Sequence, residues 1–186
     1  MRQFVYENLD HVLCVLVLIS RLGDVVSTRL ATPKLKLEAN PIAKKLGWWF
    51  IAATLGLCVV PYFHRGAAVV VLTVSCLVSA SNISKLWAIR ALGEEGYHRH
   101  MMRMARKAKP LHAMGGYVAA SLFVALLGAT QILLSPGPSR DWGYWFGLGI
   151  LTYAFAMLIY GPIAYRRFFR QAKKLLAETP EGELET

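Results

Sequence analysis

The chain has 186 residues, of which 55% are hydrophobic and only 17% are charged, and its mean hydropathy is +0.41. A water-soluble domain of this length carries fewer apolar and more charged residues, so the composition argues against that class. The formal net charge of +10 would suggest nucleic acid in a soluble protein. Here the basic residues stand at the ends of apolar runs, which is typical of membrane proteins and argues against a nucleic-acid partner.

Five apolar runs predict five transmembrane helices, because a helix needs about 20 residues to cross a bilayer. In chain order the runs cover residues 11–31, 41–62, 66–91, 113–134 and 142–165. The first run is interpreted as a retained helix, since Asp24 and Thr28 follow without the small-residue cleavage site of a signal peptide. The predicted fold is an all-α integral membrane protein, with one transmembrane helical domain over residues 1–177 and a disordered polar tail over residues 178–186.

Lys and Arg residues are concentrated in alternate loops of this five-helix arrangement. One side holds Lys34, Lys36, Lys44, Lys45, Arg90, Arg99, Arg103, Arg106, Lys107, Lys109, Arg166, Arg167, Arg170, Lys173 and Lys174, and the other holds Arg2, Arg65 and Arg140. Loops rich in Lys and Arg face the cytoplasm, so the N-terminus is predicted outside and the C-terminus inside. The cell (inner) membrane is the expected location, with anionic lipids as partners of the basic inner loops.

Polar side chains inside the predicted spans form two stripes at helical spacing. The first comprises Ser20, Asp24 and Thr28, and the second comprises Ser75, Ser79, Asn82 and Lys85. An ionised Asp at the centre of a membrane helix costs about 2.5–3.5 kcal/mol on insertion scales, so Asp24 is expected to face the bundle and to have a partner. Two interpretations stay open. Asp24 either forms an ion pair with Arg21 or Lys85, or belongs to a site for an ion, a proton or a polar ligand.

The segment Glu38-Ala-Asn40-Pro41 precedes the second predicted helix. Helix capping explains part of it, since Asn is a good N-cap and Pro fits the first helical position. The alternative is that Glu38 and Asn40 supply oxygen atoms to a site near the inner side of the membrane. That candidate site comprises Asp24, Thr28, Glu38, Asn40, Asn82 and Lys85. Oxygen ligands of this kind suit a hard cation such as Mg²⁺, Mn²⁺, Ca²⁺ or Na⁺.

The same segment carries a family resemblance. Asp24-Val-Val-Ser-Thr28 followed by Glu38-Ala-Asn-Pro41 resembles the signature of an uncharacterised family of small prokaryotic multi-pass membrane proteins. In that family an Asp and a Thr in the first helix precede a Glu-Ala-Asn-Pro turn that leads into the next helix. The resemblance covers roughly residues 20–60, and this chain has Leu35-Lys36-Leu37 where the family pattern has a glycine. It implies a location for the site and no activity.

The third predicted loop and the glycines raise two further questions. Residues 88–109 are basic and either extend the third helix into the cytosol or lie on the membrane surface. Within them, Glu94, Glu95, His98 and His100 are interpreted as part of a solvated surface, with a metal site as the alternative. Close approach of helices is expected at Gly115, Gly116, Gly128, Gly143 and Gly147.

Three functional hypotheses follow from the sequence. The first is transport of a cation or small solute through the polar site. The second is an accessory or assembly subunit of a larger membrane complex, in which the polar stripes make interhelical contacts, and a homo-oligomer is open as well. The third is a lipid-acting intramembrane enzyme with Asp24 and Glu38 as acid and base. The common hydrolase, zinc-protease and nucleotide-binding motifs are missing from the sequence, which argues against an enzyme.

Overall fold

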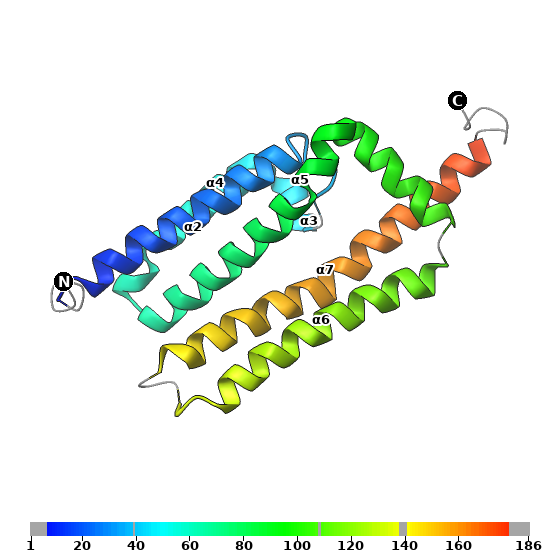
Figure 1. Cartoon of the computed structure of the whole chain (residues 1–186). Helices are drawn as coiled ribbons and strands as arrows, with labels where there is room; N and C mark the ends of the chain where they lie inside the picture. The colour runs from blue at the N-terminus through cyan, green and yellow to red at the C-terminus, as the bar shows by residue number, and fades with distance from the viewer. Residues whose placement is uncertain (1–6, 39, 108, 138–140, 179–186) are drawn as a thin grey trace.

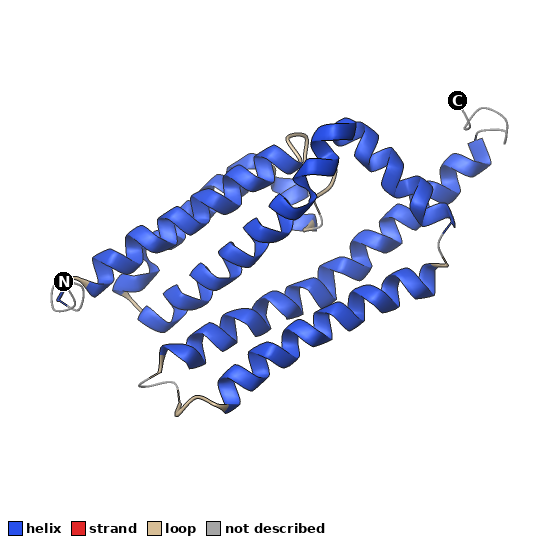
Figure 2. Ribbon diagram, in the orientation of Figure 1, coloured by secondary structure: helices blue, strands red, loops and turns tan. Residues whose placement is uncertain are grey.

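The computed structural model describes residues 7–38, 40–107, 109–137 and 141–178, which contain helices and loops but no strand (Figure 2). The elements are α2 (Leu9–Ala31), α3 (Pro41–Leu46), α4 (Trp48–Ala53), the 3₁₀-helix η1 (Thr54–Tyr62), α5 (Arg65–Lys107), α6 (Pro110–Leu133) and α7 (Trp142–Glu178). The all-helical fold class predicted from the sequence is therefore confirmed. Of the predicted disordered tail, Glu178 ends α7, and residues 179–186 lie outside the described residues.

The long helices pack as neighbours in a row (Figure 1). α7 lies between α6 and α5, α5 also contacts α2, and η1 packs against both α2 and α5. We call the end of the bundle where residues 32–40 connect α2 to α3 the kink end, because α5 bends there. The helices α2, α5 and α7 all begin at the opposite end (Figure 1).

Three of the helices are long and apolar enough to cross a membrane. They contain the segments Arg65–Ala105, Leu111–Leu133 and Trp142–Gln171. Large apolar side chains cover their outward surfaces, and Phe123 of α6 and Phe155 of α7 are 69% and 64% exposed. Extended apolar exposure of this kind is unfavourable in water and normal against lipid, so these helices are consistent with a membrane protein.

The second predicted helix is not a single helix in the structure. The prediction of one helix over residues 41–62 is wrong because Gly47, with φ 69°, ends α3 and begins α4. Glycine adopts this left-handed conformation without the steric cost that a Cβ atom would add. From Thr54 the chain then continues as the 3₁₀-helix η1, which includes Pro61.

The third predicted helix is longer than expected and is bent. α5 continues beyond residue 91 to Lys107, with Gly93 in a non-helical conformation (φ 70°, ψ 162°). Beyond this kink the helix turns across the C-terminal half of α7 (Figure 1), and the ring of His98 lies 5.3 Å from that of Phe168. The structure shows α5 continuing from residue 88 to Lys107 with a change of direction at Gly93 that was not predicted. Whether this segment extends into the cytosol or lies on the membrane surface stays a prediction.

Two of the glycines make backbone contact between α6 and α7. A Cβ atom added to Gly128 would lie 2.9 Å from the carbonyl oxygen of Gly147, and one added to Gly147 would lie 2.8 Å from the carbonyl oxygen of Gly128. Contact this close requires the absence of both side chains. Gly115 and Gly116, which were predicted to serve the same purpose, have no atom within 4 Å of an added Cβ.

Candidate functional site

A buried ion pair on α2 lies at the centre of the candidate site. Arg21 and Asp24 are three residues apart and therefore on the same helix face, and Arg21 Nη1 is 2.5 Å from Asp24 Oδ2. Their side chains are 12% and 13% exposed, so both charges are largely removed from solvent. Of the interpretations that the sequence left open for Asp24, the structure shows the ion pair with Arg21.

Arg21 also connects α2 to two other elements. Its Nη1 donates to the Ser75 hydroxyl of α5 at 3.2 Å, and its Nη2 donates to the Thr54 hydroxyl at the start of η1. The remaining guanidinium nitrogen, Nε, is buried, and it has no hydrogen-bond partner among the described residues. A buried donor left in this way costs about 1–3 kcal/mol relative to a satisfied one.

A second set of hydrogen bonds extends the network along α2 and α5. The Thr28 hydroxyl donates to Asp24 Oδ1 at 3.4 Å. The Asn82 amide of α5 donates to the hydroxyls of Thr28 and Ser27 at 3.0 and 3.3 Å. Asn82 lies seven residues after Ser75, which is two turns of helix, so both face α2. We call this set the Arg21 cluster, and it comprises Arg21, Asp24, Ser27, Thr28, Thr54, Ser75 and Asn82.

Three of the six residues predicted for the site belong to the Arg21 cluster, namely Asp24, Thr28 and Asn82. Lys85 does not, because its side chain is exposed and donates to Ser81 Oγ, one turn back on the same helix, at 3.3 Å. Lys85 thus lies outside the cluster in the structure, and its part in a site stays a prediction.

Glu38 and Asn40 make local hydrogen bonds in the loop before α3. Asn40 Oδ1 accepts from the Ile42 amide at 2.9 Å, which is the N-cap interaction, and Pro41 takes the first helical position. Glu38 Oε1 accepts from the Asn40 amide at 2.8 Å. These contacts support the capping interpretation for Asn40, and a site that Glu38 and Asn40 share with Asp24 stays a prediction.

Arg21 and Thr54 were not among the predicted site residues. Arg21 was expected only as a partner for Asp24, although its long side chain carries five donors and reaches two neighbouring elements. Thr54 is a lone hydroxyl in an apolar run, a weak signal on its own. A buried Arg in an apolar helix, together with a hydroxyl on the following segment, is the pattern that would have indicated this contact.

Glu94 forms a separate contact at the kink end. It follows the kink glycine directly, and its carboxylate accepts from the Thr32 hydroxyl at 2.5 Å and from the Lys34 and Lys36 amides, each at 3.0 Å. Between those amides Leu35 is buried and has φ 54°, an unfavourable conformation for a residue with a side chain. The three hydrogen bonds therefore hold the loop in a conformation that it would not adopt alone.

Removal of the Glu94 carboxylate is expected to loosen this loop. In Glu94→Ala, trypsin should cleave after Lys34 and Lys36 at least about ten times faster than in the wild type, since hydrogen bonds to a charged acceptor are worth about 1.5–3 kcal/mol each. Limited proteolysis followed by mass spectrometry measures both cleavage rates. Glu95→Gln is the matched control, because Glu95 pairs with the exposed Lys36 side chain, whereas Glu94 accepts from the loop amides. Equal rates in both variants would contradict the assignment.

His98 gives the kink end a dependence on pH. Burial lowers the pKa of His98 below its usual value of about 6.5, with Lys36 acting in the same direction and Glu95 opposing it. The folded state therefore prefers the neutral ring. This contribution to stability is complete above pH 6.5 and is lost as the pH falls through the lowered pKa.

We expect the unfolding midpoint to be lower at pH 5.5 than at pH 7.5, with part of this decrease due to His98. A thermal melt in detergent at several pH values measures it. His98→Gln should flatten the dependence, whereas His100→Gln, at an exposed position two residues away, should retain it. An unchanged dependence in His98→Gln would show that other groups cause it.

The structure does not support the alternative of a metal site at Glu94, Glu95, His98 and His100. Within the described ranges, no group of three or more His, Cys, Asp or Glu side chains is placed to hold a metal ion. The Glu94 carboxylate instead accepts a hydrogen bond from the Lys36 amide of the loop after α2, and the Glu95 carboxylate pairs with the Lys36 side chain.

Comparison with protein families, with curated proteins and with solved structures finds no match to this chain. The resemblance to the Asp-x3-Thr and Glu-Ala-Asn-Pro signature therefore stays a prediction from the sequence. The functional argument rests on the geometry of the Arg21 cluster.

Proposed function

We propose that the chain is a five-span protein of the cell (inner) membrane, with its N-terminus outside and its C-terminus inside. α2 has 23 residues, about 35 Å of helix, which exceeds the ~30 Å of hydrocarbon. The six residues of α4 and the nine of η1 rise about 9 and 18 Å, because a 3₁₀-helix is the more extended form. Together they extend about 27 Å, close to one crossing, and the basic loops then alternate as the topology requires.

A pair of reporter fusions tests this topology. A fluorescent protein fused after Thr186 should mature, because it stays in the cytoplasm, and a periplasmic phosphatase fused there should be inactive. The same phosphatase fused within residues 135–141 should be active, since that loop is proposed to be outside. The opposite pattern at either position would reject the orientation.

We further propose that the Arg21 cluster binds a small polar solute for transport. The observation that carries this is the buried Nε of Arg21, which has no acceptor among the described residues. A solute with a hydrogen-bond acceptor would satisfy that donor, and the Asp24 carboxylate, which also accepts from the Thr28 hydroxyl, lies beside the same guanidinium. Asp24 is already neutralised by Arg21, so the geometry favours such a solute over the hard cation expected from the sequence.

Ligand-dependent stabilisation of the purified protein tests this proposal. Thermal melts in detergent would compare sodium acetate, sodium phosphate and glycine, with NaCl and MgCl₂ as the cation series. A bound solute at 100 times its Kd adds about 2.7 kcal/mol of stability. Arg21→Lys keeps the charge but removes Nε and the planar fork, so it should abolish the shift. Lys85→Gln, which lies outside the cluster, should retain it.

The second candidate function is that of an accessory or assembly subunit. The contacts within the Arg21 cluster favour this function. Arg21 and Asn82 connect α2 with η1 and α5, so the network can serve to hold these helices together. In that case no solute would shift the melt, and Asp24→Ala would weaken co-purification of a membrane partner. The lipid-acting enzyme gains no support, because Asp24 pairs with Arg21 while Glu38 accepts from the Asn40 amide.

A further inference from the structure

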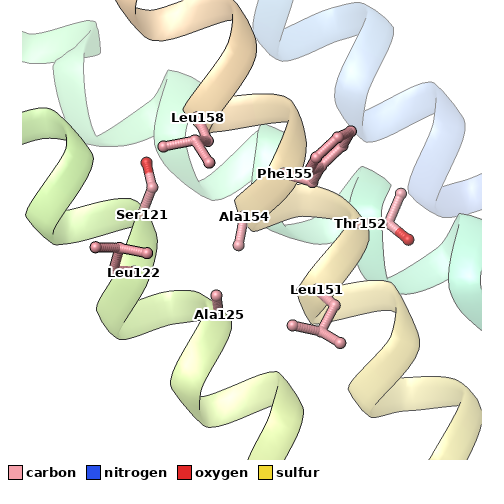
Figure 3. Close-up of a pocket in the computed structure, with 8 residues that line it drawn as sticks. All are labelled: Ser121, Leu122, Ala125, Leu151, Thr152, Ala154, Phe155 and Leu158. Atoms are coloured by element: carbon pink, nitrogen blue, oxygen red, sulfur yellow. The ribbon is translucent and has the colours of Figure 1, made fainter.

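A groove runs between α6 and α7, away from the Arg21 cluster (Figure 3). Its volume is about 380 Å³, and it is lined by Ser121, Leu122, Ala125, Leu151, Thr152, Ala154, Phe155 and Leu158. The two hydroxyls in this lining donate to carbonyl oxygens of their own helices, Ser121 to Tyr117 and Thr152 to Leu148. The groove therefore offers an occupant mainly apolar surface.

The α7 side of the groove leads to a basic surface. Phe155, Leu158, Pro162 and Arg166 follow one another at spacings of three, four and four residues, which places them on one face of the helix. Arg166 is exposed and forms no ion pair with any described residue. No acidic residue occurs between positions 142 and 177, and Glu178, the last residue of α7, is twelve residues beyond Arg166, so Arg166 has no acidic neighbour on its own helix.

The distances fit one leaflet of a bilayer. Arg166 lies eight residues beyond Leu158, about 12 Å along the helix axis, and Leu151 lies about 10 Å further in the other direction. The total of about 22 Å equals half of a bilayer about 40–45 Å thick including its headgroups. With Arg166 at headgroup level, the groove then reaches the middle of the membrane.

We propose that the α6–α7 groove holds one acyl chain of an anionic glycerophospholipid of the inner leaflet, with the lipid phosphate on Arg166. This inference rests on the proposed membrane topology. Arg suits the role because its planar fork donates two hydrogen bonds to a phosphate. The unneutralised positive charge of the surrounding helix favours a lipid with a net negative charge over a zwitterionic one.

Native mass spectrometry of the detergent-solubilised protein tests the proposal by measuring the fraction that carries one bound lipid. The probes are phosphatidylglycerol, phosphatidylcholine and inorganic phosphate. Arg166→Gln should weaken phosphatidylglycerol binding about fivefold, the equivalent of about 1 kcal/mol for one cationic side chain near an anionic surface. Arg167→Gln is the matched control, since it removes an exposed neighbouring charge from a different face of α7.

A second pair of variants tests the groove itself. Thr152→Phe places a ring in the groove from an exposed position, so it should reduce lipid retention without disturbing the fold. Leu126→Phe adds bulk on the exposed surface of α6 outside the groove lining, and should bind lipid as the wild type does.

The expected pattern is preference for phosphatidylglycerol, with loss in Arg166→Gln and Thr152→Phe only. Three results would overturn the proposal. They are equal binding of the two lipids, displacement of the bound lipid by inorganic phosphate alone, and wild-type lipid retention in both Arg166→Gln and Thr152→Phe. Flotation of the protein with phosphatidylcholine vesicles distinguishes failure of the proposed topology from failure of the lipid-binding inference. If the protein does not insert at all, the proposed topology fails. If it inserts but binds no lipid selectively, only this inference fails.

Discussion

Asp24→Ala is expected to be strongly destabilised, by about 3–5 kcal/mol, because it leaves the Arg21 guanidinium buried without its counter-charge. The Thr28 hydroxyl would lose its acceptor at the same time. The midpoint of thermal unfolding in detergent measures the effect, and a loss of this size lowers the midpoint by about 6–20 °C.

A double variant separates the charge from the packing at this position. In Arg21→Met with Asp24→Leu both charges are replaced by apolar side chains, and most of the lost stability should return, since a buried ion pair is often no better than apolar packing. If Asp24→Ala melted at the same temperature as the wild type, the pair would not be buried as described. If the double variant were the less stable of the two, the hydrogen bonds of Arg21 to Thr54 and Ser75 would carry most of the stability.

Gly128→Ala is expected to lower stability by about 1–3 kcal/mol, because the added methyl group meets the backbone of Gly147 and Leu151 and forces α6 away from α7. Gly116→Ala on the same helix is the control. Its added methyl group has no atom within 4 Å, and alanine is the better helix former by about 0.5–1 kcal/mol.

The two alanine variants should therefore shift the melting temperature in opposite directions. Loss of stability in both would mean that glycine is needed throughout α6 for a reason other than contact with α7. A gain in both would mean that the helices can separate at Gly128 without cost. Either result can be read from melts of the wild type and the two single variants under one set of conditions.

Most of the helix positions could be predicted from apolar run length alone. The first predicted helix ends at Ala31 in both sequence and structure, and the fourth, over residues 113–134, differs from α6 by three residues at its start and one at its end. The break at Gly47 and the kink at Gly93 could not be predicted in the same way. A glycine permits a positive φ without requiring it, and at Gly93 the tertiary contacts of the next residue, Glu94, accompany the bend.

Part of the candidate site could also be predicted from the sequence, because residue spacing determines which side chains share a helix face. Helical spacing relates Asp24 to Thr28 and places Asn82 two turns from Ser75, which brings their faces together when α2 and α5 pack. Spacing says nothing about which segment lies opposite, so Thr54 on η1 was not found. For Asn40, the local cap on α3 was the correct interpretation, because a hydrogen bond two residues away needs no tertiary structure.

The row of helices has a consequence for the order in which the chain assembles during synthesis. The principal contacts among α2, η1 and α5 are complete within the first 107 residues, and those between α6 and α7 lie within residues 110–178. The N-terminal group can thus pack while the rest is still on the ribosome, and the C-terminal hairpin can join it afterwards along the face that α5 presents to α7.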